Sequence, residues 1–308
     1  MSTLYQQQKN NIWKTWLLMT VFLVLIIILG FLLAMYYGNP NILYITFIFS
    51  LALNFFSYYF SDKVALSMAG ATEIKNRNEH AEFWNVVENL SITAGLPKPK
   101  LYIIDDPLPN AFATGRNENH SAVAVTSGLL LILNKSELEG VIAHELSHIK
   151  NKDILLQTII VVLVGVIAII SDLFFRMHFF GNGDNGGNKN ILVYIVLLIA
   201  IILAPLAATI IKLAISRRRE FLADSSGALL TRYPEGLASA LQKISSYNQP
   251  LKNAHMATAH LYIVNPLGFS GHSDKKEKSE KEISWLTKLF LTHPPTQDRI
   301  QALLKTQA

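Results

Sequence analysis

Five consecutive residues, His144-Glu145-Leu146-Ser147-His148, have the types and the spacing that metal-dependent hydrolysis requires. Residues four apart lie on the same face of a helix, so the imidazoles of His144 and His148 can reach a single ion. Glu145 is rotated aside from His144, where it can take a proton from an attacking water and pass it to the leaving amine. The segment therefore predicts a metallopeptidase helix that carries two ligands and a general base.

Two histidines do not complete a catalytic zinc site, which needs three protein ligands and an open position for water. In the segment "SRRREFLADSSGA", Glu220 and Asp224 are again four residues apart on a predicted helix. Glu220 would complete a His₂Glu set for one Zn²⁺ per chain, and Asp224 would orient a ligand histidine through its other ring nitrogen. The spacing equally allows Glu220 to pair with a nearby lysine or arginine.

Long apolar segments separate the polar parts of the chain. Only 16% of the 308 residues are charged, whereas soluble domains carry about 25%. The deficit is concentrated in four segments, at 16–37, 42–60, 154–175 and 191–211. Each approaches the roughly 20 residues that a helix needs to cross a bilayer. The sequence therefore predicts an α-helical membrane protein with four transmembrane helices in two hairpins.

The positions of lysine and arginine orient these helices. Basic residues are concentrated on one side of the hairpins, whereas the loop of the second hairpin has only Arg176 and Lys189 against Asp184. Those on the first side are Lys9, Lys14, Lys63, Lys150, Lys152, Arg217, Arg218 and Arg219. The positive-inside rule then places both termini and both long polar segments on the cytoplasmic side of the membrane. The absence of cysteine agrees with a reducing compartment, but it does not distinguish that compartment from an oxidising one. The net charge of +5 is explained by this flanking charge next to anionic lipid, and nothing in it requires nucleic acid.

These segments divide the chain into five parts. We expect a cytoplasmic tail at 1–15, a membrane hairpin at 16–60, the first part of a catalytic domain at 61–153, a second hairpin at 154–215 and the second part at 216–308. Neither polar part looks complete alone, and together they are long enough for one core. They are predicted to fold as one unit that the second hairpin interrupts.

Local patterns place elements in the first polar part. Phe83, Val86, Val87 and Leu90 have helical spacing, and that helix is expected to end at Gly95. Segments 100–105 and 121–128 have the composition of strands. In the helix that carries the two histidines, Ser136 and Glu139 are predicted to form the capping box.

Five sequence blocks resemble the signature set of the HtpX family of bacterial membrane zinc metalloproteases, relatives of the CAAX prenyl protease. They are "NAFATG" (110–115), "AVAVTSGLL" (122–130), "HELSH" (144–148), "SRRREFLAD" (216–224) and "HPPTQDRI" (293–300). The resemblance covers nearly the whole chain. It implies an α+β, gluzincin-like zinc peptidase domain with His144, His148 and Glu220 as zinc ligands and Glu145 as general base. It also implies a location in the bacterial inner membrane with the active site facing the cytoplasm, and a role in clearing misfolded membrane proteins.

Two further segments have two interpretations each. With the resemblance, Asn110, Ala111, Phe112 and Ala113 are expected to bind an extended substrate through backbone hydrogen bonds. Without it they are a loop that enters a strand, and Asn110 is a turn residue. His293 precedes two prolines that suit a helix start, and it would either serve only in that cap or help to stabilise the tetrahedral oxyanion.

The combined features predict a membrane-anchored zinc endopeptidase of protein quality control and stress response. The metal helix ends near Asp153, and the third apolar segment starts at the next residue, so the site is expected at the membrane surface. Its substrates and partners would be misfolded or damaged membrane proteins, through their cytoplasmic loops or tails, and the lipid bilayer. A CAAX-type processing protease with lipid-modified substrates and a non-catalytic zinc-binding scaffold or transporter are the alternatives.

Overall fold

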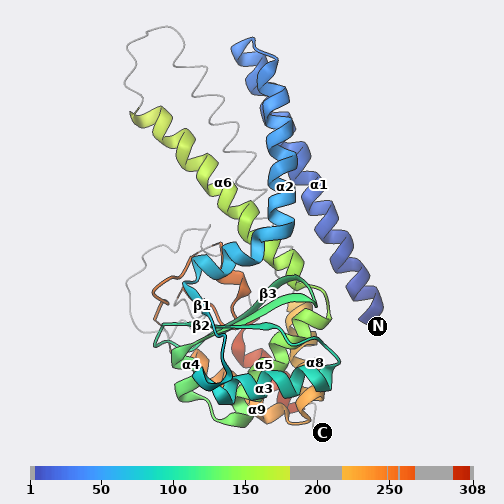
Figure 1. The fold of residues 1–308 in the computed structure, drawn as a ribbon, viewed down its shortest axis with the longest axis vertical. Helices are drawn as coiled ribbons and strands as arrows, with labels where there is room; N and C mark the ends of the chain where they lie inside the picture. The colour runs from blue at the N-terminus through green and yellow to red at the C-terminus, as the bar shows by residue number, and fades with distance from the viewer. Residues whose placement is uncertain (1–3, 181–216, 248, 256, 268–293, 306–308) are drawn as a thin grey trace.

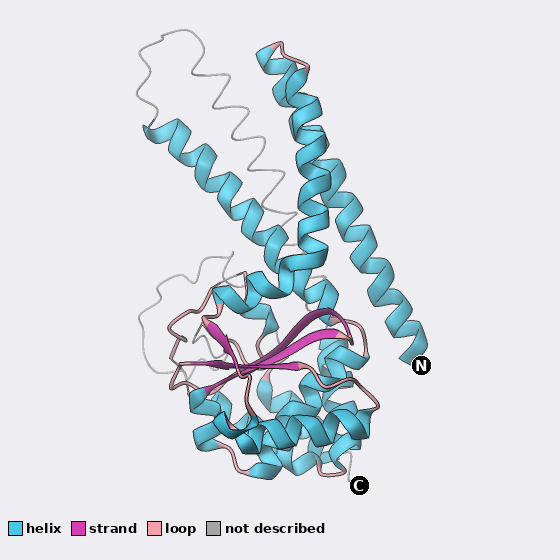
Figure 2. Cartoon of the chain, viewed as in Figure 1, coloured by secondary structure: helices cyan, strands magenta, loops and turns pink. Residues whose placement is uncertain are grey.

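The computed structural model describes residues 4–180, 217–247, 249–255, 257–267 and 294–305. Three long helices extend from a body that contains the only sheet in the described residues (Figures 1 and 2). The long helices are α1 (Leu4–Tyr37), α2 (Asn41–Met68) and α6 (Ile154–Phe180). The described chain is therefore mostly helical, with a small sheet at the base of the long helices.

The sheet has four strands in the order β1-β2-β4-β3. They are β1 (Ala71–Glu73), β2 (Lys100–Ile104), β3 (Ala111–Asn117) and β4 (His120–Thr126). β2 pairs with β4 in parallel, and the other two pairs are antiparallel. The strands at 100–105 and 121–128 were predicted. Without the family resemblance β3 was predicted as a loop that enters a strand, and it is in fact a full strand at the edge of the sheet.

The sheet separates two apolar cores, because successive side chains of a strand point to opposite faces. On β3, Phe112 belongs to the core shared with α1, α2 and α6, whereas Ala111 and Ala113 belong to the core of the body. β4 alternates in the same way. Both faces of the sheet are therefore covered, one by the long helices and one by the helices of the body (Figure 1).

The helices of the body gather around one of them, Lys135–Lys150, which packs against β3 on the second face of the sheet. They are α3 (Ala81–Ala94), α4 (Ser127–Ile132), α5 (Lys135–Lys150), α8 (Arg217–Thr231), α9 (Pro234–Ser245) and α11 (Thr296–Lys305), with short 3₁₀ turns η1 (Arg77–Glu79) and η2 (Ala259–Leu261). The predicted burial of one face of α3 is confirmed. Gly95 ends α3 with φ +68°, which glycine adopts without steric strain.

The predicted capping box of α5 is wrong by two residues. Asn134, not Ser136, is the N-cap, and its side chain accepts the Glu137 N–H at 3.0 Å. The Glu137 carboxylate in turn accepts the Asn134 N–H at 2.9 Å. Glu137 also receives hydrogen bonds from Ser239 at 2.6 Å and Lys243 at 2.7 Å on α9, so it is buried, whereas Glu139 faces solvent. The contacts of Glu137 with α9 therefore favour the capping box of Asn134 and Glu137 over that of Ser136 and Glu139.

Two helices of the described chain, Gln8–Met35 and Asn41–Met68, are long and apolar enough to cross a membrane. A third crossing is counted only if α5 and the start of α6, which meet at an 84° bend, form one span. The fourth apolar segment, 191–211, lies outside the described residues. The arrangement of four spans therefore stays a prediction.

The first long helix starts earlier than its apolar segment. α1 begins at Leu4, and its first turns contact the end of α5: Gln8 donates to the Lys150 carbonyl at 2.8 Å and Asn11 to the Asn151 carbonyl at 3.2 Å. Residues predicted as a tail are thus helical, because their polar side chains satisfy carbonyls at the C-terminus of the metal helix.

Replacing Glu137 by Gln is expected to lower stability by about 1 kcal/mol at neutral pH. Burial alone would raise the pKa of Glu137, but its bonds to Lys243, Ser239 and the Asn134 N–H outweigh burial and lower it. A lowered pKa stabilises the fold above the unfolded value of about 4.3, and this contribution is lost as the pH falls below it.

The measurement is the thermal unfolding midpoint in detergent between acid and neutral pH. The matched control is Glu139→Gln, whose only ion pair among the described residues is with Lys135 at 4.0 Å. We expect the difference between wild type and Glu137→Gln to shrink toward acid pH, with little change in the control at any pH. Equal effects of both substitutions would contradict the inner capping box.

Candidate metal centre

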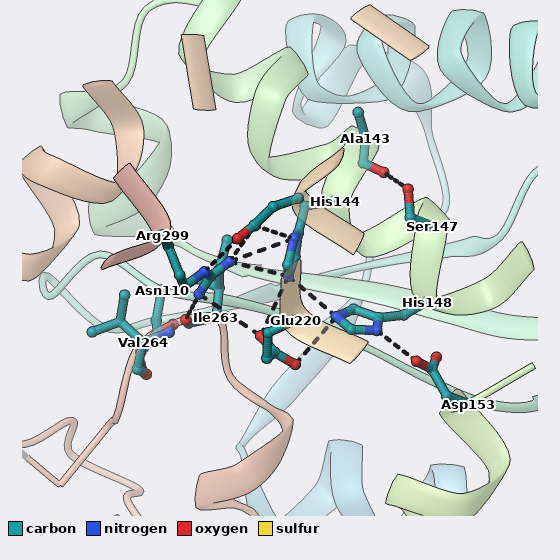
Figure 3. A network of polar contacts seen from close by, with 11 residues as sticks. Asn110, Ala143, His144, Ser147, His148, Asp153, Glu220, Ile263, Val264 and Arg299 are labelled. Atoms are coloured by element: carbon teal, nitrogen blue, oxygen red, sulfur yellow. Dashed lines mark hydrogen bonds and ion pairs between the residues drawn. The ribbon is translucent and has the colours of Figure 1, made fainter. Parts of the chain in front are cut away.

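Helices α5 and α8 bring three metal-ligating side chains together. His144, His148 and Glu220 are all buried, and one ligand atom from each lies within 4.8 Å of the others (Figure 3). The approach of the helices depends on Gly227 of α8, because a Cβ there would lie 3.0 Å from the His144 backbone nitrogen. The structure therefore joins the two segments that the sequence analysis had linked only by chemistry.

The spacing of these atoms fits a divalent metal. The two Nε2 atoms are 3.1 Å apart, and Glu220 oxygens lie 3.8 Å from each of them. Tetrahedral zinc with bonds of about 2.0–2.1 Å separates its ligand atoms by roughly 3.3–3.5 Å. Small side-chain shifts would therefore seat one ion between His144, His148 and Glu220.

The other nitrogen of each imidazole is held by a carboxylate. Asp224 Oδ1 lies 2.9 Å from His144 Nδ1, and Asp153 Oδ2 lies 3.0 Å from His148 Nδ1. Such partners fix the tautomer and the ring orientation, so that Nε2 presents its lone pair to the metal. Asp224 lies where the sequence analysis expected an orienting residue. Asp153, between α5 and α6, was not predicted as a site residue.

Arg299 of α11 contacts both Asp224 and Glu220. Its guanidinium donates two hydrogen bonds to Asp224, from Nε at 2.9 Å and Nη2 at 2.7 Å, and one to the Ile263 carbonyl at 3.0 Å. Nη1 also lies 3.7 Å from Glu220. Arg299 is 1% exposed, so its charge balances those of two buried carboxylates.

Glu145 is buried and faces strand β3. Its carboxylate accepts a hydrogen bond from the Ala113 backbone N–H. Burial is the largest influence on Glu145 and raises the pKa of its carboxyl to about 7. A general base works best when its pKa lies near the working pH. The position and the raised pKa of Glu145 therefore suit a general base.

The two histidines differ in the direction in which their pKa values are shifted. Burial lowers the pKa of His144. Burial also acts to lower the pKa of His148, but Asp153 and the other nearby carboxylates raise it to about 10. Although burial opposes its ionisation, Arg299 lowers the pKa of Asp224 to about 2. A protonated His148 would partly neutralise the nearby carboxylates. A bound metal ion would supply that positive charge instead, because His148 must lose its proton to bind the metal.

Asn110 to Ala113 lie beside the site at the edge of the sheet. The Asn110 side chain donates to the Val264 carbonyl at 2.8 Å, and the Ala111 carbonyl accepts the Ile263 N–H at 2.9 Å. Phe112 packs edge-on against Tyr262. This edge of β3 therefore already pairs in part with residues 263–264, and the Ala113 N–H points to Glu145.

The sequence analysis did not predict Arg299 or Asp153 as site residues, and it predicted His293, which the structure does not describe. His293 lies outside the described residues. Arg299, in the same sequence block, contacts the network instead, and its signal was an arginine six residues after the prominent histidine. Asp153 had a weaker signal, an acidic residue five positions after His148 at the start of an apolar segment.

A helix with two histidines four apart, a glutamate ligand from a second helix and a buried glutamate beside them define a metallopeptidase site. A sequence model of peptidase family M48 matches residues 77–307. The chain therefore belongs to peptidase family M48, a family of metalloproteases.

Relatives match over almost the full length. A "Protease HtpX homolog" of Dictyoglomus turgidum is 46% identical over 302 residues, which are 98% of this chain and 94% of the relative. One of Pyrococcus furiosus is 46% identical over 297 residues, 95% of this chain and 94% of the relative. The resemblance to the HtpX family is thereby confirmed.

A solved structure shares the fold. The crystal structure of S. mikatae Ste24p aligns with a TM-score of 0.50 and 17% identity over 92% of this chain. The chain spans 62% of the length of that protein. At this identity the likeness supports the arrangement of helices and sheet.

Replacing Gly227 by Val is expected to weaken zinc binding at least about tenfold, because the added side chain pushes α8 and Glu220 away from α5. The control is Ser225→Val, which places the same β-branched residue on an exposed position of α8. Zinc affinity is measured by competition with a chromophoric chelator. Unchanged affinity in Gly227→Val would contradict the close helix packing.

Replacing Asp153 by Asn is expected to weaken zinc binding by about 10–100-fold, because the imidazole of His148 loses its anionic partner. The control is Asp106→Asn. Asp106 is equally buried but accepts the Leu108 and Lys252 N–H groups, away from the site. The same chelator competition separates the two. A similar small effect of both substitutions would show that Asp153 acts only on folding.

Proposed function

We propose that this metalloprotease is a zinc endopeptidase that cleaves cytoplasmic loops and tails of membrane proteins, including misfolded ones, at the cytoplasmic face of the membrane. The observation that carries the proposal is the position of the ligand triad. His148 lies on α5, and its partner Asp153 directly precedes α6, an apolar helix bent 84° from α5. A site built at this elbow is fixed close to the start of a long apolar helix.

The donor set supports zinc, since two imidazoles and a carboxylate with an open position are its usual catalytic ligands. When bound there, zinc supplies Lewis acidity and a water of lowered pKa. His144, His148 and Glu220 hold the ion, while Asp224 and Asp153 fix the rings. Glu145 accepts the proton of the attacking water and delivers it to the amine of the departing peptide.

The edge of β3 supports binding of an extended peptide. Ala111 and Ala113 direct backbone groups away from β4, but the Ala111 carbonyl already accepts from the Ile263 N–H and the Ala113 N–H donates to Glu145. An extended peptide would therefore have to displace these partners or pair with the other outward groups of the edge. A peptide that adds to this edge gains affinity through its main chain, with little demand on its side chains. This favours a broad substrate range, as quality control of misfolded proteins requires. His293 as an oxyanion donor remains a prediction from the sequence.

Replacing Glu145 by Gln tests the proposal, because the amide keeps the shape but cannot accept the proton. We expect cleavage of an unstructured reporter tethered to a membrane helix to fall by about 10²–10⁴-fold. Zinc content, measured by atomic emission on detergent-purified protein, stays at one ion per chain.

The same reporter without its membrane helix is the substrate control. We expect the tethered form to be cleaved faster at equal concentration, and chelation of zinc to stop both reactions. Full cleavage by Glu145→Gln would remove the general-base role. Full zinc content without cleavage by the wild type of either reporter would favour a zinc-binding scaffold.

A further inference from the structure

The metal helix α5 ends in a cap that contains a residue of the metal site. The Lys152 N–H donates to the Ile149 carbonyl at 3.1 Å, and the Asp153 N–H donates to the His148 carbonyl at 3.3 Å. Lys152 itself has a left-handed backbone, with φ +56°. These two bonds and the left-handed residue define a Schellman motif, in which the residue after the left-handed one packs against the third residue from the helix end. In α5 these two positions are Asp153 and His148.

The cap therefore determines where the carboxylate of Asp153 lies. In many such caps the side chains at the two positions make an apolar contact. Here Asp153 Oδ2 lies 3.0 Å from His148 Nδ1, so that contact is replaced by the one that orients a metal ligand. Asp153 is 1% exposed, and α6 begins at the next residue. A small shift of the cap would move the carboxylate relative to the imidazole.

The cap leaves two carbonyls at the helix end to donors from elsewhere in the chain. Its own N–H groups bond to the carbonyls of residues 147–149. The next two carbonyls, of Lys150 and Asn151, accept hydrogen bonds from side chains of α1. Gln8 Nε2 donates to the first at 2.8 Å, and Asn11 Nδ2 donates to the second at 3.2 Å. The first turns of α1 thus complete the cap of the metal helix.

Asn11 is the buried member of this pair. It is 5% exposed, whereas Gln8 is half-buried. Burying a polar side chain lowers stability unless the side chain is hydrogen-bonded. Asn11 makes its bond to Asn151, the residue directly before the left-handed turn. A single buried contact therefore joins α1 to the turn that positions Asp153.

We propose that Asn11 is a positioning residue of the metal site and acts through the cap of α5. Its amide holds the carbonyl of Asn151, the cap holds Asp153, and Asp153 holds the ring of His148 with Nε2 toward the metal. Because α1 contains the first candidate span, the position of that span against the body helps to order the zinc ligands. This role concerns the metal site and does not depend on the substrate.

The test measures the zinc affinity of the full chain in detergent by competition with a chromophoric chelator. Asn11→Leu keeps the approximate size of the side chain and removes the donor. We expect it to weaken zinc binding about three- to tenfold, the range that corresponds to one lost hydrogen bond. The matched control is Asn10→Leu, the same change one position earlier on an exposed part of α1. It should leave the zinc affinity unchanged.

A double-substitution cycle separates positioning from a general loss of stability. If Asn11 acts through Asp153, Asn11→Leu should have almost no further effect on zinc affinity in the Asp153→Ala background, because the orienting carboxylate is already absent. A purely structural effect would give the same fold-change in both backgrounds. Cobalt(II) bound in place of zinc gives a second readout, since its visible absorption bands change with ligand geometry. Asn11→Leu should shift these bands, and Asn10→Leu should not.

Gln8→Leu replaces Asn11→Leu in the cycle if the latter does not fold, because Gln8 makes the other bond to this helix end from a half-buried position. A loss of zinc affinity that disappears in the Asp153→Ala background would support the proposal. Unchanged zinc affinity in the folded variant would overturn it. A loss that is equal with and without the Asp153 carboxylate would overturn it as well, and would leave Asn11 with a role in folding alone.

Discussion

The close approach of α8 to the backbone of α5 is the contact on which the rest of the site depends. Gly227 permits it, because any side chain there would meet the main chain around His144. The contact brings Glu220 within reach of both imidazoles and Asp224 within a hydrogen bond of His144. It is also a contact between two parts of the sequence that the second long apolar region separates. The metal centre can therefore form only when both polar parts of the chain have folded together.

This contact buries an unusual number of charges. Glu145, Glu220, Asp224 and Asp153 are each at most 4% exposed. Buried carboxylates are tolerated only when cations and hydrogen bonds compensate them. Arg299 serves Asp224 and Glu220, and Arg219 lies close enough to Asp153 and Glu220 to interact with both carboxylates. The same carboxylates raise the pKa of His148, which favours a positive charge on that imidazole. The negative charge of the residues around the ligands therefore favours the binding of a cation at this position.

The sequence was informative where chemistry follows from local spacing. The two histidines and Glu145 could be predicted because they lie within two turns of one helix. Spacing left the role of Glu220 open, and the family resemblance assigned it as a ligand. Arg299 and Asp153 could not be predicted, because their roles come from contacts between elements distant in sequence. The cap of α5 shows the same limit on a smaller scale. Asn134 with Glu137 and Ser136 with Glu139 are both valid capping pairs, and only the contacts of Glu137 with Ser239 and Lys243 on α9 distinguish them.

Strand β3 was harder to predict than its neighbours for a related reason. Its small residues, Ala111 and Ala113, have little strand preference of their own, and their conformation is imposed by pairing with Val125 and Val123 of β4. The spans illustrate the opposite case. Their composition predicts long helices well, but α1 and α2 extend beyond their apolar segments because polar residues at their ends, such as Gln8 and Ser61, contact or are buried against the body.

The elbow between α5 and α6 has a consequence for how the protein responds to its lipid surroundings. Lys152 adopts φ +56°, and Asp153 follows it, bonded to His148 and directly joined to α6. If α6 crosses the bilayer, its tilt changes with the thickness of the hydrocarbon layer. The short connection then passes that tilt to the carboxylate that orients a metal ligand. Membrane thickness would in that case influence the coordination geometry, and the same chain would have different catalytic efficiency in thin and thick bilayers.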